Sequence, residues 1–149
     1  MSRTYSVAGP NQSDTADRTA VNVIAGTTIR PMIYDVLLDS AETPTDQATL
    51  WTVGRTNSTG FSPSTPTPEP LDPADVASAC STGITHTFEP TYVGLSLLQI
   101  SMNKRHTFRW TARRGRELIG LAVPGNGIGV KLSTATASLI MNATVQWRE

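Results

Sequence analysis

The residues best suited to catalysis or metal binding in this sequence are two histidines, His86 and His106, and one cysteine, Cys80. A histidine-based metal site needs its ligands close together on one element, or joined by cysteine and carboxylate ligands. The histidines are 20 positions apart, and His106 lies beside bulky apolar residues. We therefore interpret both as core or sheet-face histidines. A cysteine nucleophile needs a base nearby, and the sequence offers few candidates for one. Cys80 is therefore expected to be a small, partly buried residue.

Two further patterns could have chemical roles. Residues 125–129, Gly-Asn-Gly-Ile-Gly, lead into an alternating strand, whereas a phosphate-binding loop opens a helix. We therefore interpret these glycines as a tight turn with close backbone packing. Four acids offer the oxygen ligands that calcium prefers, although their spacing matches no EF-hand loop. These acids are Asp35, Asp39, Glu42 and Asp46. The sequence predicts no enzymatic activity and no cofactor.

Five arginines form the one local concentration of basic charge. They are Arg105, Arg109, Arg113, Arg114 and Arg116. Guanidinium groups bind carboxylates in bidentate geometry and are enriched at protein interfaces. The cluster is therefore either a solvated strand face and turn, or a contact with an acidic protein surface or a sister subunit. No nucleic-acid partner is expected, because 12 Lys and Arg are balanced by 12 Asp and Glu, and phosphate binding needs a basic excess.

A proline-rich stretch interrupts the chain at residues 62–73, SPSTPTPEPLDP. Proline has no amide hydrogen to donate, so this stretch cannot form a central strand and should run as an extended surface loop. It is either a long connection between strands or an arm that clasps a neighbouring subunit, since loops of this length are often functional. The candidate interface prolines are Pro63, Pro66, Pro68 and Pro70.

Alternation of apolar and polar residues with a period of two indicates strands along the chain. Between Leu139 and Trp147, apolar residues occupy the odd positions and mostly polar residues the even ones. Such alternation is typical of a half-buried strand, whereas a helix would scatter both sets around its circumference. Strands are expected at residues 21–23, 32–38, 49–53, 92–102, 105–111, 117–123, 128–132 and 139–147. About eight closely spaced strands predict an all-β sandwich or barrel.

The chain of 149 residues has the size of one domain. Residues 1–18 are polar and lack periodicity, so we expect a flexible N-terminal arm there and a single β domain over residues 19–149. No apolar region follows Arg3, and no stretch approaches about 20 apolar residues. The sequence therefore predicts neither a secretory signal nor a membrane span, and a protein that is made in the cytoplasm and stays soluble.

Several strings, in order from about Ile29 to the last strand, resemble a family of capsid decoration, or cement, proteins of tailed bacteriophages. The strings are Arg30-Pro31, Tyr34-Asp35, 43–46 (TPTD), 71–73 (LDP), 89–92 (EPTY), 103–110 (NKRHTFRW), 115–118 (GREL) and 126–129 (NGIG). The resemblance implies a single jelly roll of about eight antiparallel strands with a long proline-rich loop. It also implies a homotrimer on the outer surface of the virion, bound across subunits of the major capsid protein. The chain departs from the family in the proline-rich loop and in the sequence Lys104-Arg105-His106. The loop puts the exact contacts between subunits in doubt.

Two alternatives belong to other functional classes. A receptor-binding or carbohydrate-binding jelly roll at a phage tail would need an aromatic platform, to which Trp51 and Tyr92 could contribute. A cupin-type oxygenase would need clustered histidine and carboxylate ligands, and two histidines argue against it. Binding to capsids, as opposed to glycans, separates the first alternative from the capsid role.

Overall fold

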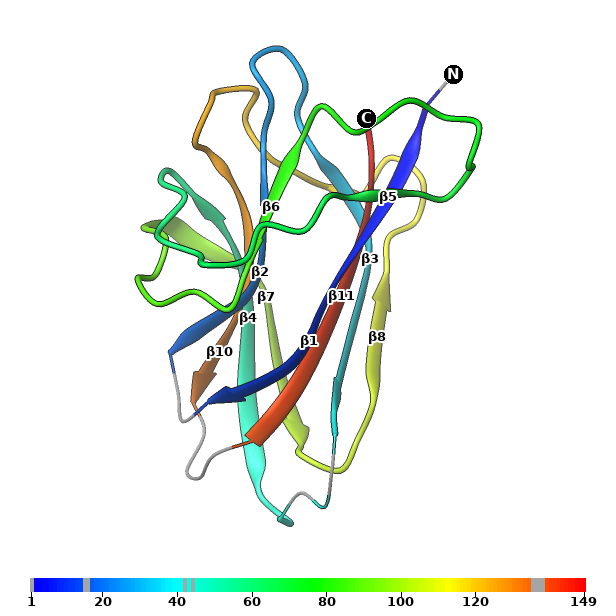
Figure 1. Ribbon diagram of the computed structural model, residues 1–149. Coiled ribbons are helices and arrows are strands. Elements are labelled where there is room, and N and C mark those ends of the chain that lie inside the picture. Colours follow the sequence, from blue (N-terminus) through cyan, green and yellow to red (C-terminus); the bar gives the residue numbers. More distant parts are fainter. Residues whose placement is uncertain (1, 15–16, 42, 44, 135–138) are drawn as a thin grey trace.

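The computed structural model describes residues 2–14, 17–41, 43, 45–134 and 139–149, which form eleven strands in two antiparallel sheets, with no helix among them. The two sheets pack face to face (Figure 1). The expectation of an all-β protein is confirmed. Three of the eleven strands, β1, β5 and β6, have no counterpart among those expected from the sequence.

The first sheet has six strands in the order β5-β1-β11-β3-β8, with β9 also paired to β3. Its strands are β1 (Thr4–Asp14), β3 (Met32–Ser40), β5 (Glu69–Pro70), β8 (Phe108–Thr111), β9 (Leu118–Ile119) and β11 (Leu139–Arg148). The second sheet has five strands in the order β6-β2-β10-β4-β7. Its strands are β2 (Arg18–Ile24), β4 (Ala48–Thr56), β6 (Ser81–Ile84), β7 (Tyr92–Asn103) and β10 (Gly127–Thr134).

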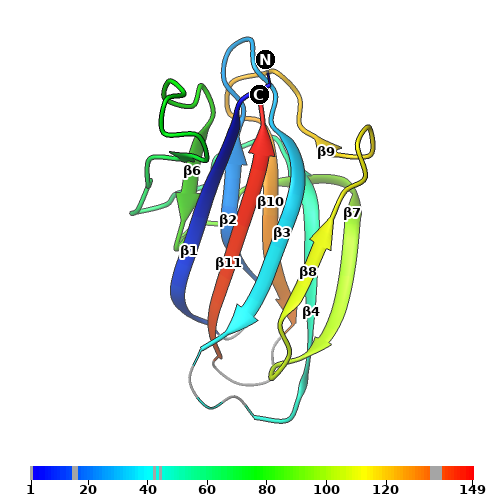
Figure 2. The same ribbon diagram turned by 90° about the vertical axis from the view of Figure 1, so that its right-hand side faces the viewer.

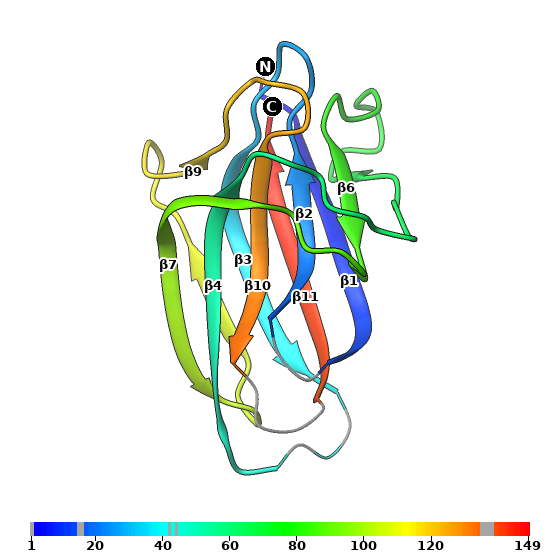
Figure 3. The same cartoon turned by 90° about the vertical axis from the view of Figure 1, so that its left-hand side faces the viewer.

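The sandwich therefore has two lateral edges (Figures 2 and 3). Strands β5 and β6 end the two sheets on one side, and β8 and β7 end them on the other. We refer to these sides as the β5/β6 edge and the β7/β8 edge. Both chain termini lie at the same end of the sandwich (Figure 1).

The core lies between the sheets and is built from alternate residues of the long strands. Ala143, Val145 and Trp147 of β11 are buried, as their alternation predicts. Trp147 and Trp51, on opposite sheets, are the two largest fully buried side chains. Close packing of such large apolar groups supplies most of the free energy that holds a sandwich together.

The N-terminal segment is part of the fold, contrary to the flexible arm expected over residues 1–18. Strand β1 pairs with β11 along its length and with β5 near its start. Tyr5 is fully buried, its ring lies 6.0 Å from that of Trp147, and Val7 is also buried. The expectation was wrong because only these two large apolar residues mark the strand, before Gly9 and Pro10 interrupt the pattern.

The proline-rich stretch forms a connection that packs on its own chain. Glu69 and Pro70 form β5, which suits proline because an edge strand needs fewer backbone donors. Ser64 pairs with Ile84 of β6. The hydroxyl of Thr82 donates to the carbonyl of Pro66 at 2.5 Å. The stretch thus runs from the edge of one sheet to the edge of the other and covers the side of the sandwich.

Candidate functional site

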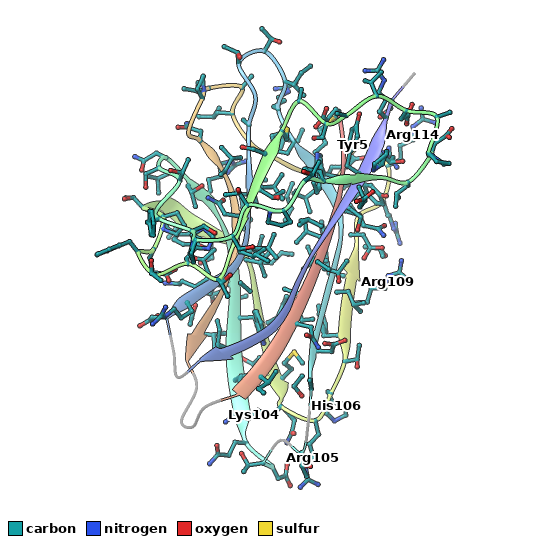
Figure 4. All side chains as sticks on the ribbon, viewed as in Figure 1. Tyr5, Lys104, Arg105, His106, Arg109 and Arg114 are labelled. Carbon is teal, nitrogen blue, oxygen red and sulfur yellow. The ribbon has the colours of Figure 1, made fainter. Side chains whose placement is uncertain are left out.

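The five arginines singled out in the sequence all lie along the β7/β8 edge. Arg109 lies in β8, Arg105 in the turn between β7 and β8, and the other three in the turn between β8 and β9. All five are exposed. Figure 4 shows Arg105, Arg109 and Arg114 spread along the length of this side. The structure therefore places all five arginines on one edge, but they are distributed along its length and do not form one compact patch.

Arg109 is held by a buried carboxylate. Its Nε lies 3.0 Å from Oδ2 of Asp35, and its Nη2 lies 2.5 Å from the same oxygen. The Asp35 side chain is only 7 % exposed, whereas that of Arg109 is 62 % exposed. The hydrogen bonds and the charge of Asp35 raise the pKa of Arg109. Because a buried carboxylate needs a partner, we infer that the main role of Arg109 is to stabilise the fold by pairing with Asp35.

Arg113, Arg114 and Arg116 differ from Arg109 because none of the three side chains has a hydrogen bond or ion pair with a described residue. Their turn is closed by the amide of Arg116, which donates to the carbonyl of Arg113 at 2.9 Å. Gly115 adopts a φ of 80°, which glycine adopts without strain. The turn thus presents three free guanidinium groups, the donors that bind carboxylates best.

Charge is divided between the two edges, a feature that our reading of the sequence missed. Residues 56–103 contain four acids and no lysine or arginine, whereas residues 104–116 contain six basic residues and no acid. The four acids are Glu69, Asp72, Asp75 and Glu89. They lie in β5 and in the connections on either side of β6, so they belong to the β5/β6 edge. The acids of residues 56–103 therefore lie at one edge and the arginines of residues 104–116 at the other, although Asp75 is paired with Arg3 at 3.9 Å.

Lys104 is the one basic residue of residues 104–116 that does not reach the surface. It is 1 % exposed, and its Nζ donates to Oε1 of Gln47 at 3.0 Å. The charge at the β7/β8 edge is therefore carried by arginine side chains.

Strand β7 carries the most exposed large apolar side chain among the described residues, Leu95, at 92 % exposure. The pairing with β4 passes from Val93 opposite Arg55 to Leu98 opposite Val53, so residues 94–97 face Gly54 alone. This bulge lifts Leu95 away from the sheet. The sequence reading missed it because the apolar run indicated one regular strand, although Gly94, with a φ of 71°, marks the break.

A cavity of about 300 Å³ lies at the opposite, β5/β6 edge. Its walls are formed by Ile24, residues 59–62 with Thr65, and residues 81–83 of β6. Phe61 and Phe88, joined by a backbone hydrogen bond of 2.9 Å, are 58 % and 73 % exposed. This edge therefore combines acidic residues with exposed aromatic rings and a hollow.

The four candidate prolines occupy different environments. Pro63 is exposed, Pro66 and Pro70 are half-buried, and Pro68 is buried. Pro68 is therefore covered by its own chain. The structure places the others on the surface of the β5/β6 edge, where the connection covers the side of the sandwich.

Two of the remaining candidates, His86 and Cys80, are buried within the fold. His86 is 1 % exposed, its Nδ1 lies 3.1 Å from the carbonyl oxygen of Thr19, and burial lowers its pKa. Burial, aided by the nearby Glu149 charge, raises the pKa of the Cys80 thiol to about 12. His106 is exposed. In the part of the chain that the structure describes, no three His, Cys, Asp or Glu side chains lie close enough to hold a metal ion.

The acids considered for calcium have separate partners. Asp35 binds Arg109, Asp39 accepts a hydrogen bond from Asn142 at 2.7 Å, and Asp46 accepts one from Asn103. Glu42 lies outside the described residues. The glycines of residues 125–129 lead into β10, where a side chain on Gly129 would collide with the hydroxyl of Tyr92. Gly127 and Gly129 serve close packing, as expected, whereas Gly125 has open space around it and adopts the positive φ of 84° that a turn requires.

The aromatic platform proposed for a lectin is not assembled from Trp51, which is 1 % exposed in the core. Tyr92 is half-buried and covers Gly54 and Gly129, with its hydroxyl 2.9 Å from Oγ1 of Thr19. Over the described residues, no helix is long and apolar enough to cross a membrane. Comparison of the chain with protein-family models, curated proteins and solved structures finds no match to any of them.

Proposed function

We propose that this chain is a jelly roll. Of the eleven strands in the described residues, eight correspond to the two four-stranded layers of that fold: β1, β2, β3, β4, β7, β8, β10 and β11. They pair antiparallel as first with last, second with seventh, third with sixth and fourth with fifth. This is the pairing of one long hairpin rolled into two layers. Jelly rolls of this kind occur in viral capsid proteins and in lectins.

We further propose that the protein is a non-enzymatic virion component, which decorates and stabilises the outer surface of a tailed-phage capsid. In this role it binds across subunits of the major capsid protein as a homotrimer, after synthesis in the host cytoplasm. The observation that supports the proposal best is the turn of Arg113, Arg114 and Arg116, whose free guanidinium groups stand on a rigid sandwich. Such groups suit contact with acidic protein surfaces.

The physical basis of such a role is linkage. A protein that binds the assembled shell and not the dissociated subunits stabilises the shell by mass action. Three linked copies add avidity, because each further contact forms at a high effective concentration. Neither effect requires an active site.

Co-sedimentation with capsids tests the proposal. The purified protein should bind mature or expanded empty capsids saturably, with a fixed copy number per capsomer. Combined replacement of Arg113, Arg114 and Arg116 by Ala should weaken binding by at least about tenfold, the effect of losing one strong charged contact. Arg30→Ala, at another exposed arginine, is the matched control and should bind normally. Absence of wild-type binding to both kinds of capsid would contradict the capsid role.

A carbohydrate-binding role at a phage tail is the second candidate, and one feature favours it. A hollow of about 250 Å³ on the outer face of the first sheet is lined by Asp35, Leu37, Arg109, Thr144 and Gln146. The adjacent Tyr34 donates from its hydroxyl to Gln146 at 3.2 Å. Polar side chains beside an aromatic ring suit a sugar. Glycan-array binding that is lost in Gln146→Ala, together with no capsid binding, would favour this role.

A further inference from the structure

We propose that the chain associates with itself head to tail, so that the β7/β8 edge of one copy docks on the β5/β6 edge of the next. In this arrangement Leu95 of one copy enters the cavity between residues 59–65 and β6 of its neighbour. The partner is a second copy of this chain. The inference deepens the self-association in the proposed function, but it does not depend on a capsid.

Charge is the first argument for this pairing. The β7/β8 edge carries the free guanidinium groups of the turn at Arg113, Arg114 and Arg116. The opposite edge carries the exposed carboxylates of Glu69 and Asp72. Contact between unlike edges places arginine against carboxylate, whereas contact between two copies of the same edge brings like charges together. Electrostatics therefore favours opposite edges over identical ones.

Apolar shape is the second argument. Leu95, at 92 % exposure, is a knob on a bulge of the edge strand β7. The cavity of about 300 Å³ at the other edge is bordered by Ile24 and by the exposed ring of Phe61. A large apolar side chain that enters a pocket on a neighbour is a typical anchor of a protein interface.

Topology makes the two features compatible in one assembly. Strands β6 and β7 are the two ends of the same sheet, so the knob and the cavity lie on opposite sides of one layer. Contacts between different surfaces are heterologous and generate a ring when the rotation between copies closes. Lateral contacts of this kind leave the end with both chain termini free (Figure 2). A ring of three copies would thus satisfy both edges of every copy.

Sedimentation velocity on the purified full chain tests the inference. The wild type should form a closed oligomer whose stability falls as salt rises from about 50 mM to about 500 mM, because exposed charges are then screened. Leu95→Asp removes the knob, and Ser81→Arg fills the cavity from an exposed position in its wall. Each variant alone should weaken association by at least about tenfold, as loss of an anchor does.

Mixing the two variants gives the sharpest result. A Leu95→Asp copy keeps an intact cavity and a Ser81→Arg copy keeps an intact knob, so the mixture should form a one-to-one dimer and nothing larger. Leu121→Asp and Thr28→Arg, at exposed positions in other connections, are the matched controls and should assemble normally. Near-ultraviolet circular dichroism checks folding, and Leu95→Ser and Thr65→Arg replace any variant that fails to fold.

Three outcomes would overturn the inference. The first is a wild type that stays monomeric up to roughly 100 µM, a concentration above the dissociation constant of a specific interface. The second is an oligomer that persists in either variant, and the third is a variant mixture that contains no heterodimer. Capsid co-sedimentation keeps the two proposals distinct. A monomer that binds capsids would contradict only the proposed self-association. An oligomer that does not bind capsids would contradict only the proposed capsid role.

Discussion

The two lateral edges of the sandwich are built on different principles. At the β5/β6 edge, the chain covers its own sheets: Glu149 accepts hydrogen bonds from Ser78, from the amides of Ala79 and Cys80, and from the indole of Trp147. The hydroxyl of Tyr5 adds a bond of 2.9 Å to the carbonyl of Val76. The β7/β8 edge instead leaves Leu95 and three arginines in solvent. The β5/β6 edge therefore combines contacts that stabilise the fold with the exposed cavity, whereas the β7/β8 edge offers mainly exposed side chains.

The largest expected effect on stability tests whether β1 contributes to the β5/β6 edge. Tyr5→Ala removes a fully buried ring that packs on Trp147, so it should lower the free energy of unfolding by about 3–5 kcal/mol. Tyr5→Phe keeps the ring but loses the hydroxyl with its bond to Val76, and should cost about 1 kcal/mol. Urea unfolding measures both. A loss below about 1 kcal/mol for Tyr5→Ala would restore the flexible arm that the sequence predicted.

The next effect concerns Glu149 and depends on pH. Burial alone would raise the pKa of this carboxyl, but the hydrogen bonds from Ser78, Ala79, Cys80 and Trp147 outweigh it and hold the pKa below the usual 4.5. The unfolded chain therefore binds a proton first as pH falls. The stabilisation is fully present above pH 4.5 and is lost as pH falls through the lower pKa of the folded state.

Glu149→Gln should therefore lower the free energy of unfolding at pH 7 by about 1–2 kcal/mol, since the carboxylate is half-buried and partly screened by solvent. The difference from wild type should shrink below pH 4.5. Glu69→Gln, at an exposed acid of the same edge, is the control and should have little effect. Equal losses for both variants would show that Glu149 does not hold the edge together.

A smaller effect comes from His86, a buried residue of the connection between β6 and β7. Burial lowers its pKa, so the unfolded chain takes up the proton first, and stability should fall as pH drops below the usual 6.5. The slope cannot exceed about 1.4 kcal/mol per pH unit, the limit for one proton. His86→Gln should flatten it. In a His106→Gln background, the single remaining imidazole signal in NMR belongs to His86 and should titrate below pH 6.5.

The smallest effect on the free energy of unfolding is expected at the β7/β8 edge. Leu95→Ala should change the free energy of unfolding by less than about 0.5 kcal/mol, because the side chain is 92 % exposed. Leu38→Ala, the same substitution at a fully buried position of β3, should cost about 2–5 kcal/mol. Urea unfolding of the two variants compares surface with core directly. A cost above about 1 kcal/mol at Leu95 would place this edge within the folding unit and weaken its assignment to contact.

The strands that were predicted correctly carry either apolar residues at every second position or, in β7 and β9, a run of apolar residues. Strand β11 is the clearest, and the buried Ala143, Val145 and Trp147 follow its alternation. Strand β1 was missed because it is held by pairing with β11, from the far end of the chain. Strand β5 was missed because two residues, one of them Pro70, show no periodicity. The arginine turn was found from composition alone, but the capture of Arg109 by Asp35 was not.

The sequence by itself determined the class of the fold, because side-chain alternation depends only on neighbours along the chain. It also determined the local excess of arginine. Only the tertiary structure decided which strands lie at the edges, that the acids of residues 56–103 lie on one side and the arginines of residues 104–116 on the other, and that Leu95 and the cavity lie at opposite ends of one sheet. These features arise from pairing between distant segments, and no local pattern encodes which distant partner a strand will find.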